Sequence, residues 1–213
     1  MSFRMSDFRL NRHVLLGLIL LLAGCSEGPR QAAAPSEPAA PPEPVEGQKA
    51  FYQMYVAARN WAPDAQGLRL ESVEIPAVPG GKGLSGAWRA TFVSPSRNRT
   101  VIFNYAVVES SEKFLKGVFQ DHEDGYSPGG LEKPWLVSAL KTTSVSAYEV
   151  AMEQKQTQDY VKKNPDTPIM ILLEHTNRHP DLAWRIIWGT SVSTSNFSVY
   201  VDASTGEFLE ILR

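Results

Sequence analysis

Apolar positions in the first half of the folded region recur first at a helical and then at a strand period. Five of them have the spacing of one helical face: Phe51, Met54, Tyr55, Ala58 and Trp61. Pro63 ends this run, because proline cannot continue a helix. Alternating apolar residues follow, and they predict strands at residues 68–75, 86–92, 100–108 and 115–119.

The same order of patterns returns in the second half. Ser146 and Glu149 have the spacing of a capping box, which predicts the start of a second helix. Lys162 and Lys163 favour the C-terminal end of that helix, and Pro165 stops it. Strand-like stretches then follow at residues 169–174, 182–188, 196–202 and 207–212, and the second and third of these show alternation.

One segment is repeated between the two halves. Gly86–Phe92 (GAWRATF) returns as Leu182–Trp188 (LAWRIIW), 96 positions later. We therefore expect an α+β protein of two tandem units, each with one helix packed on an antiparallel β-meander. The expected first unit covers residues 48–120, a connector covers 121–143, and the second unit covers 144–213. Trp88 and Trp184 are expected to be buried beneath the helices of their units.

The N-terminus has the features of an export signal. Arginines precede a ten-residue apolar run, Val14–Ala23, which is half the length of about 20 residues that a membrane span needs. Leu22–Cys25 (LAGC) then resembles the bacterial lipobox. The resemblance implies cleavage of residues 1–24, a diacylglyceryl group on the Cys25 thiol and an acylated Cys25 amino group. Because Ser26 follows rather than aspartate, it also implies an outer-membrane protein that faces the periplasm.

Composition separates the anchor from the folded region and excludes some functions. Residues 25–47 carry the lipidated cysteine and a Pro/Ala-rich linker, which cannot bury enough apolar surface to fold. Removing residues 1–24, with three arginines and one aspartate, leaves 18 basic against 22 acidic residues, a net charge of about −4. This balance argues against a nucleic-acid partner. Cys25 is the only cysteine, so no internal disulfide can form.

The second unit resembles a known domain family. Its Ala183–Trp188 strand is followed by Tyr200–Leu209 (YVDASTGEFL), which is similar to the last hairpin of PepSY domains. In this hairpin Asp202 can accept hydrogen bonds from turn amides, and Gly206 can adopt the left-handed conformation of the bend. The resemblance covers residues 144–213, whereas residues 106–112 of the first unit have no turn glycine. It implies a binding or regulatory module of the kind proposed to restrain peptidases.

Two histidine sites are candidates for metal chemistry. The first is the cluster Asp121, His122, Glu123 and Asp124, expected in the loop between the units. It has suitable ligands for a divalent cation but lacks the Asp-x-Asp-x-Asp-Gly calcium spacing, so a solvated acidic turn is favoured. The second is His175 and His179, expected at a strand end and turn where a spacing of four does not align two imidazoles.

The sequence lacks the common catalytic and cofactor signatures. It contains no Gly-x-Ser-x-Gly elbow, phosphate loop or dinucleotide fingerprint, so no cofactor is predicted. For Trp135, in the connector, packing between the units is favoured over a role as a surface binding anchor.

Two functional classes follow. The favoured one is a lipid-anchored, non-catalytic module that binds an envelope protein or peptidase, for example by strand addition. The alternative is a metal-assisted hydrolase centred on His122, with Asp121, Glu123 or Asp124 as partners. Under the favoured interpretation, His122, His175 and His179 do not converge on one pocket.

Overall fold

A computed structural model describes residues 40–213, which form one compact unit. It confirms a mixed α+β protein with a large antiparallel sheet. The elements in chain order are β1 (Val45–Glu46), α1 (Gly47–Trp61), β2 (Gln66–Val73), β3 (Leu84–Ser85), β4 (Ala87–Ser94), β5 (Arg99–Ala106), β6 (Gly117–Gly125), the 3₁₀ turn η1 (Val137–Ala139), α2 (Ser144–Glu153), α3 (Lys155–Lys163), β7 (Ile169–Glu174), β8 (Ala183–Trp188), β9 (Phe197–Asp202) and β10 (Phe208–Leu212).

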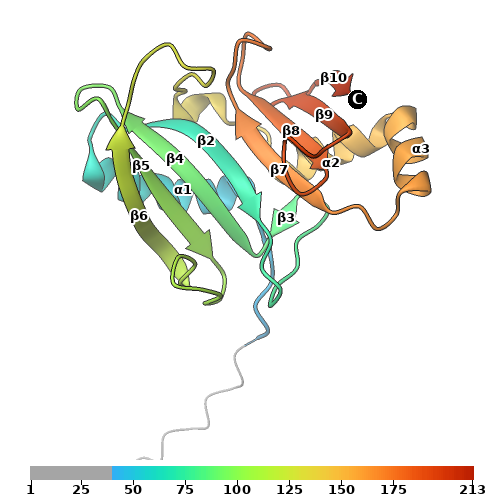
Figure 1. Cartoon of the computed structure of the whole chain (residues 1–213), viewed down its shortest axis with the longest axis horizontal. Coiled ribbons are helices and arrows are strands. Elements are labelled where there is room, and N and C mark those ends of the chain that lie inside the picture. Colours follow the sequence, from blue (N-terminus) through green and yellow to red (C-terminus); the bar gives the residue numbers. More distant parts are fainter. Residues whose placement is uncertain (1–39) are drawn as a thin grey trace, which may run out of the picture. The chain divides into compact units, whose positions relative to one another are not determined.

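Eight of these strands form one continuous antiparallel sheet. Its order is β10-β9-β8-β7-β2-β4-β5-β6, so the first long strands of the two halves, β2 and β7, pair at the centre. The last strands, β6 and β10, form the two edges. The helices cover one face: α1 packs on β2, β4, β5 and β6, and α2 packs on β8 and β9 (Figure 1).

The helix ends follow local chemistry, with two corrections. Helix α1 ends at Trp61, before Pro63, as predicted. The second half has two helices instead of the one predicted, because the extended backbone of Gln154 (φ −74°, ψ 121°) divides α2 from α3, which ends at Lys163, before Pro165. The second helix starts earlier than the Ser146–Glu149 spacing indicated. Its cap is Thr143, whose hydroxyl accepts a hydrogen bond from the Ser146 amide at 3.1 Å. The first amides of a helix have no partner within the helix, and a hydroxyl two or three residues earlier can accept a hydrogen bond from one of them. The Thr143 hydroxyl and the Ser146 amide therefore define the start of α2.

The two halves share one hydrophobic core. Trp88 and Trp184 are both fully buried, as expected from the repeated segment. Their indole N–H groups donate to Val45 O at 3.1 Å and to Thr142 O at 2.8 Å, so each bond ends on the carbonyl two residues before a helix begins. A Cβ on Gly47 would lie within 3.0 Å of both indole rings. The core therefore runs without interruption beneath α1 and α2.

The connector crosses the central strands and is fastened there. Trp135 is 4% exposed, and its ring packs at a tilt against that of Phe51, with centroids 4.8 Å apart. The ring also lies directly on Gly67, where a Cβ would be 2.5 Å away. Backbone hydrogen bonds join Trp135 and Gly67 in both directions. Only glycine leaves room for this contact, so the small residue in β2 and the large one in the connector depend on each other.

Candidate functional site

The acidic cluster around His122 lies on an edge strand, not in the connector. Strand β6 continues to Gly125, whereas the sequence predicted a strand ending at residue 119. It extends because it pairs with β5 as far as Arg99, opposite Gly125. The His122 ring lies 3.3 Å from Asp121 and 3.2 Å from Asp124, and half of the His122 side chain is exposed.

The partners of Asp121 account for its charge. Burial alone would raise the pKa of the Asp121 carboxyl. The hydrogen bond with His122 and the nearby Lys113 ammonium outweigh burial and lower this pKa. Lys113 Nζ lies 3.4 Å from this carboxylate. Within residues 40–213, no three His, Cys, Asp or Glu side chains are grouped to hold a metal ion.

The other two histidines lie elsewhere. His175 Nε2 is 3.1 Å from the Pro180 carbonyl in the β7–β8 loop, and His179 Nε2 is 3.0 Å from Glu210 of β10. Because β6 and β10 are opposite edges of the sheet, His122 and His179 are separated by its full width. The structure therefore does not bring the three histidines together.

The sheet face away from the helices carries two groups of paired charges that were not singled out in the sequence. In the first group, Arg69 bonds Glu132 of the connector at 2.6 Å and Glu71 at 3.0 Å, and Arg89 reaches Glu71 at 3.3 Å. Alternation was the available signal, since these side chains occupy the positions between buried ones.

The second group lies in the other half of the sheet. The Tyr200 hydroxyl donates to Glu174 at 2.9 Å, and Arg185 lies 3.8 Å from the same carboxylate. Burial, reinforced by the charge of Glu174, raises the pKa of the Tyr200 hydroxyl. These carboxylates and guanidiniums satisfy one another, so their arrangement favours a structural role over a catalytic one.

The two sheet edges differ in their chemistry. The β6 edge carries Asp121, His122, Glu123 and Asp124, and this run of polar side chains obstructs the addition of another strand. Both edge strands have a register shift in their pairing, β6 with β5 and β10 with β9, so the difference between the edges lies in their side chains. The β10 edge has the sequence FLEIL. Its one charge, Glu210, is held by Arg178 and lies beside His179, and the hydrogen bond from Arg178 lowers the pKa of Glu210. Phe208 is 39% exposed.

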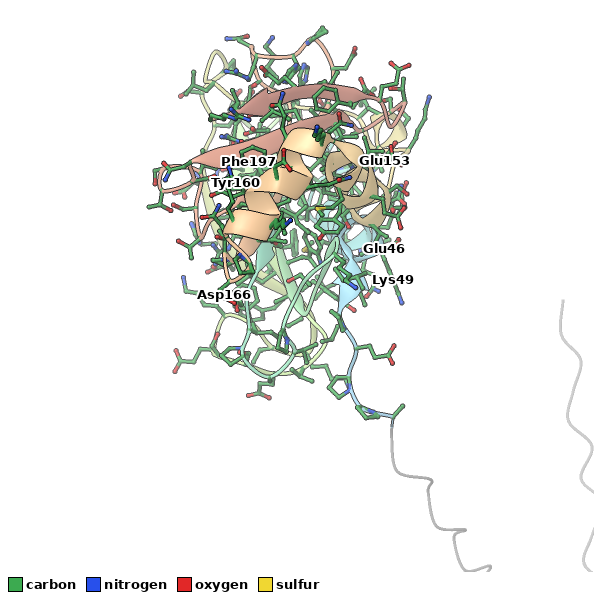
Figure 2. All side chains as sticks on the ribbon, turned by 90° about the vertical axis from the view of Figure 1, so that its right-hand side faces the viewer. Glu46, Lys49, Glu153, Tyr160, Asp166 and Phe197 are labelled. Carbon is green, nitrogen blue, oxygen red and sulfur yellow. The ribbon has the colours of Figure 1, made fainter. Side chains whose placement is uncertain are left out.

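A groove lies beside the start of β9, against α3. Tyr160 of α3 stacks on Phe197 of β9 with ring centroids 4.3 Å apart (Figure 2). The cavity has a volume of about 370 Å³, and Lys163 and Arg213 also line it. Arg213 follows β10 directly and donates to Gln156 of α3 at 3.2 Å, so the groove adjoins one end of the free edge.

The turn of the last hairpin has the predicted geometry. Asp202 Oδ1 accepts hydrogen bonds from the Ser204 and Thr205 amides, at 2.7 and 2.8 Å, and Gly206 has a positive φ of 79°.

Cys25 lies outside the described residues. No helix among residues 40–213 is long and apolar enough to span a bilayer. Comparisons with protein-family models, curated proteins and solved structures give no match to this chain.

Proposed function

We propose that this protein is a lipid-anchored, non-catalytic binding module of the bacterial envelope. Cys25 anchors it to the outer membrane, and the folded region in the periplasm binds an extended segment of an envelope protein or peptidase. The observation that carries this proposal is the β10 edge, which is apolar apart from one neutralised carboxylate and has no strand neighbour within residues 40–213. Strand addition to such an edge forms main-chain hydrogen bonds, which do not depend on the side chains of the partner.

The proposal includes two tandem PepSY-like units, the first diverged. Three features support it. Each half contributes a helical segment and then four long strands of the sheet, in the same order. Trp88 and Trp184 make equivalent hydrogen bonds to the carbonyls before α1 and α2. The paired positions Val45 and Thr142 are 97 residues apart, close to the 96-residue offset of the repeated segment.

The groove beside β10 supports a peptide as the partner. A strand added to β10 would place alternate side chains on the face that carries α3. There the stacked rings of Tyr160 and Phe197 offer an apolar surface, and Lys163, Arg213 and Asp159 offer charged groups of both signs. The volume of about 370 Å³ lies within the range of roughly 300–1,000 Å³ that is typical of ligand sites.

A defined reporter peptide tests strand addition. It alternates valine and threonine, carries fluorescein and has serine flanks. We expect its anisotropy to rise with the protein, because its main chain can pair with β10. Phe208→Lys should weaken binding about tenfold, roughly 1.4 kcal/mol, since an edge lysine opposes strand addition.

Two controls make this experiment specific. Gln120→Lys places the same charge on the exposed β6 edge and should leave binding unchanged. A reporter with N-methyl groups on alternate residues loses the donors of one strand edge and should not bind. Equal binding of both reporters, or a Kd weaker than about 1 mM for each, would contradict the proposal.

The hydrolase alternative is tested separately. His122→Ala combined with Asp124→Ala should leave the melting temperature and reporter binding nearly unchanged, because both side chains lie at an exposed edge. After dialysis, residues 40–213 should retain no stoichiometric zinc or calcium by elemental analysis. One bound metal ion per chain, lost in the double variant, would favour the hydrolase.

A further inference from the structure

The central strand pair of the sheet is short and opens into a cleft. Strands β2 and β7 pair over only three positions, from Arg69–Glu174 to Glu71–Leu172. At the next position the Ile171 amide donates to the Ser72 hydroxyl at 2.9 Å instead of to the β2 main chain. Beyond this point β7 still pairs with β8, as far as Ile169 opposite Trp188, but has no β2 neighbour.

The main chain of β7 faces into this cleft. The N–H and C=O groups of alternate residues in a strand point to the same side. Because the Ile171 amide points toward β2, the N–H and C=O groups of Ile169, two residues earlier, point that way too. Ile169 therefore presents one donor and one acceptor where the ladder is broken, which is the arrangement that a short extended segment can pair with.

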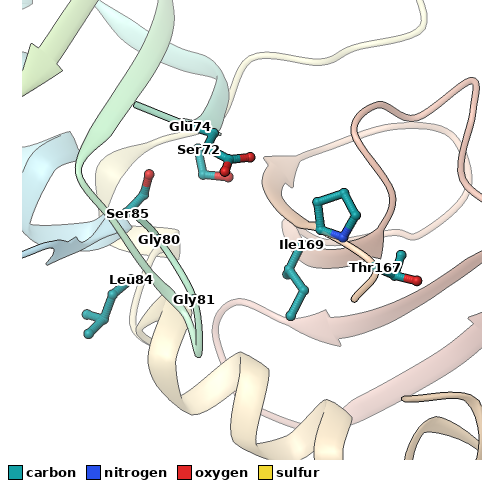
Figure 3. Close-up of a pocket in the computed structure, with 9 residues that line it drawn as sticks. Ser72, Glu74, Gly80, Gly81, Leu84, Ser85, Thr167 and Ile169 are labelled. Atoms are coloured by element: carbon teal, nitrogen blue, oxygen red, sulfur yellow. The ribbon is translucent and has the colours of Figure 1, made fainter. Parts of the chain in front are cut away.

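Glu74 gives the cleft its charge. Two adjoining cavities, of about 190 and 160 Å³, share Ser72, Glu74, Pro168 and Ile169 in their linings. The Glu74 carboxylate and the Ser72 hydroxyl point into the gap, opposite the wall that carries Ile169 and Thr167 (Figure 3). Glu74 is the only charged residue that lines either cavity, and it forms no ion pair within residues 40–213.

A third side of the cleft is held in place by the core. The Gly80–Gly81 segment closes one side of the larger cavity. It belongs to a loop that is held at the start of α2, where Ser144 Oγ donates to Gly83 O at 2.6 Å. A Cβ on Gly83 would lie 2.4 Å from Val145 Cα, so the loop packs directly on the helix. The cleft is thus bounded by elements that the core holds in place.

We propose that this cleft is a second binding site, which takes a short extended peptide segment with a basic side chain. The segment pairs with the main chain of Ile169, and its ammonium or guanidinium group binds Glu74. Each cavity is smaller than the roughly 300 Å³ at the lower end of small-molecule sites, which fits one side chain and its backbone. This inference does not depend on strand addition at β10.

The probe is the capped tripeptide acetyl-Val-Lys-Val-amide, followed by amide chemical-shift changes in the labelled full chain. We expect shifts at Ile169, Gly80 and Gly81 and none along β10. Glu74→Gln should weaken binding at least fivefold. The matched control is Glu109→Gln, which removes an exposed carboxylate outside the cleft and should have no effect. Replacing the probe's lysine by norleucine, which lacks the ammonium, should match the loss in Glu74→Gln.

A second variant tests the main-chain contact. Ile169→Pro removes the amide donor at the first position of a strand, where proline is tolerated. Its melting temperature should fall only modestly, through loss of the partly buried Ile169 side chain that packs against the core. Its affinity for the probe should fall as in Glu74→Gln.

Three outcomes would overturn the proposed site in the cleft. They are equal binding of the lysine and norleucine probes, shifts confined to β10, or binding only after deletion of residues 26–39, which would make that segment the occupant. Phe208→Lys should leave binding of the tripeptide probe unchanged. Failure of strand addition at β10 and failure of binding in the cleft therefore give different results.

Discussion

Alanine at Trp88 or Trp184 is expected to lower the free energy of unfolding by about 3 to 5 kcal/mol. Both indole rings are completely buried, so truncation leaves a large cavity in the shared core. It also leaves the carbonyl of Val45 or Thr142 without its indole donor. Chemical denaturation followed by circular dichroism measures the change. Val56→Ala, at a helix position that is 64% exposed, is the control and should stay within about 0.5 kcal/mol of the parent chain.

The double variant shows whether the two halves are energetically one body. Both rings reach Gly47 at the start of α1, so the first truncation should relax the surroundings of the second. We expect the cost of Trp88→Ala with Trp184→Ala to differ from the sum of the single costs by about 0.5 to 3 kcal/mol. Strict additivity, or single variants that unfold like the parent chain, would contradict a shared core.

Cys25→Ser is expected to abolish lipid attachment. Without the thiol no diacylglyceryl group can be added, so an uncleaved or mislocalised precursor should accumulate. The parent chain should incorporate labelled palmitate and sediment with membranes, because each buried CH₂ group contributes about 0.8 kcal/mol to membrane binding and two or three acyl chains act together. The measurement is palmitate labelling with membrane fractionation.

A neighbouring substitution provides the control for anchoring. Ser26→Ala keeps the Leu22–Cys25 segment and should be lipidated like the parent chain. Ser26→Asp should also be lipidated but should move to the inner-membrane fraction, according to the lipobox resemblance. Release of the parent chain as a lipid-free species would refute the anchoring proposal.

Short-range patterns predicted most of the elements. The strand at Ile169–Glu174 is confirmed at both ends, since a short run of apolar residues is a local signal. The roles of Asp202 and Gly206 in the last turn are also confirmed, because the turn amides and the positive φ involve residues close in the chain. The predicted cap of the second helix, Ser146, was wrong by three residues, because Thr143 is the N-cap.

The sequence by itself determined the order of the eight long strands, the position of α1 and the burial of both tryptophans, and it predicts an exported and lipidated N-terminal segment. These depend on the spacing of neighbouring residues. Only the tertiary structure decided that β2 pairs with β7, which joins the two halves into one sheet, and that β6 reaches Gly125. It alone showed that Tyr160 stacks on Phe197 and that a cleft lies beside Glu74. Such contacts join residues far apart in the chain, and the local spacing of apolar residues does not indicate which strands become neighbours.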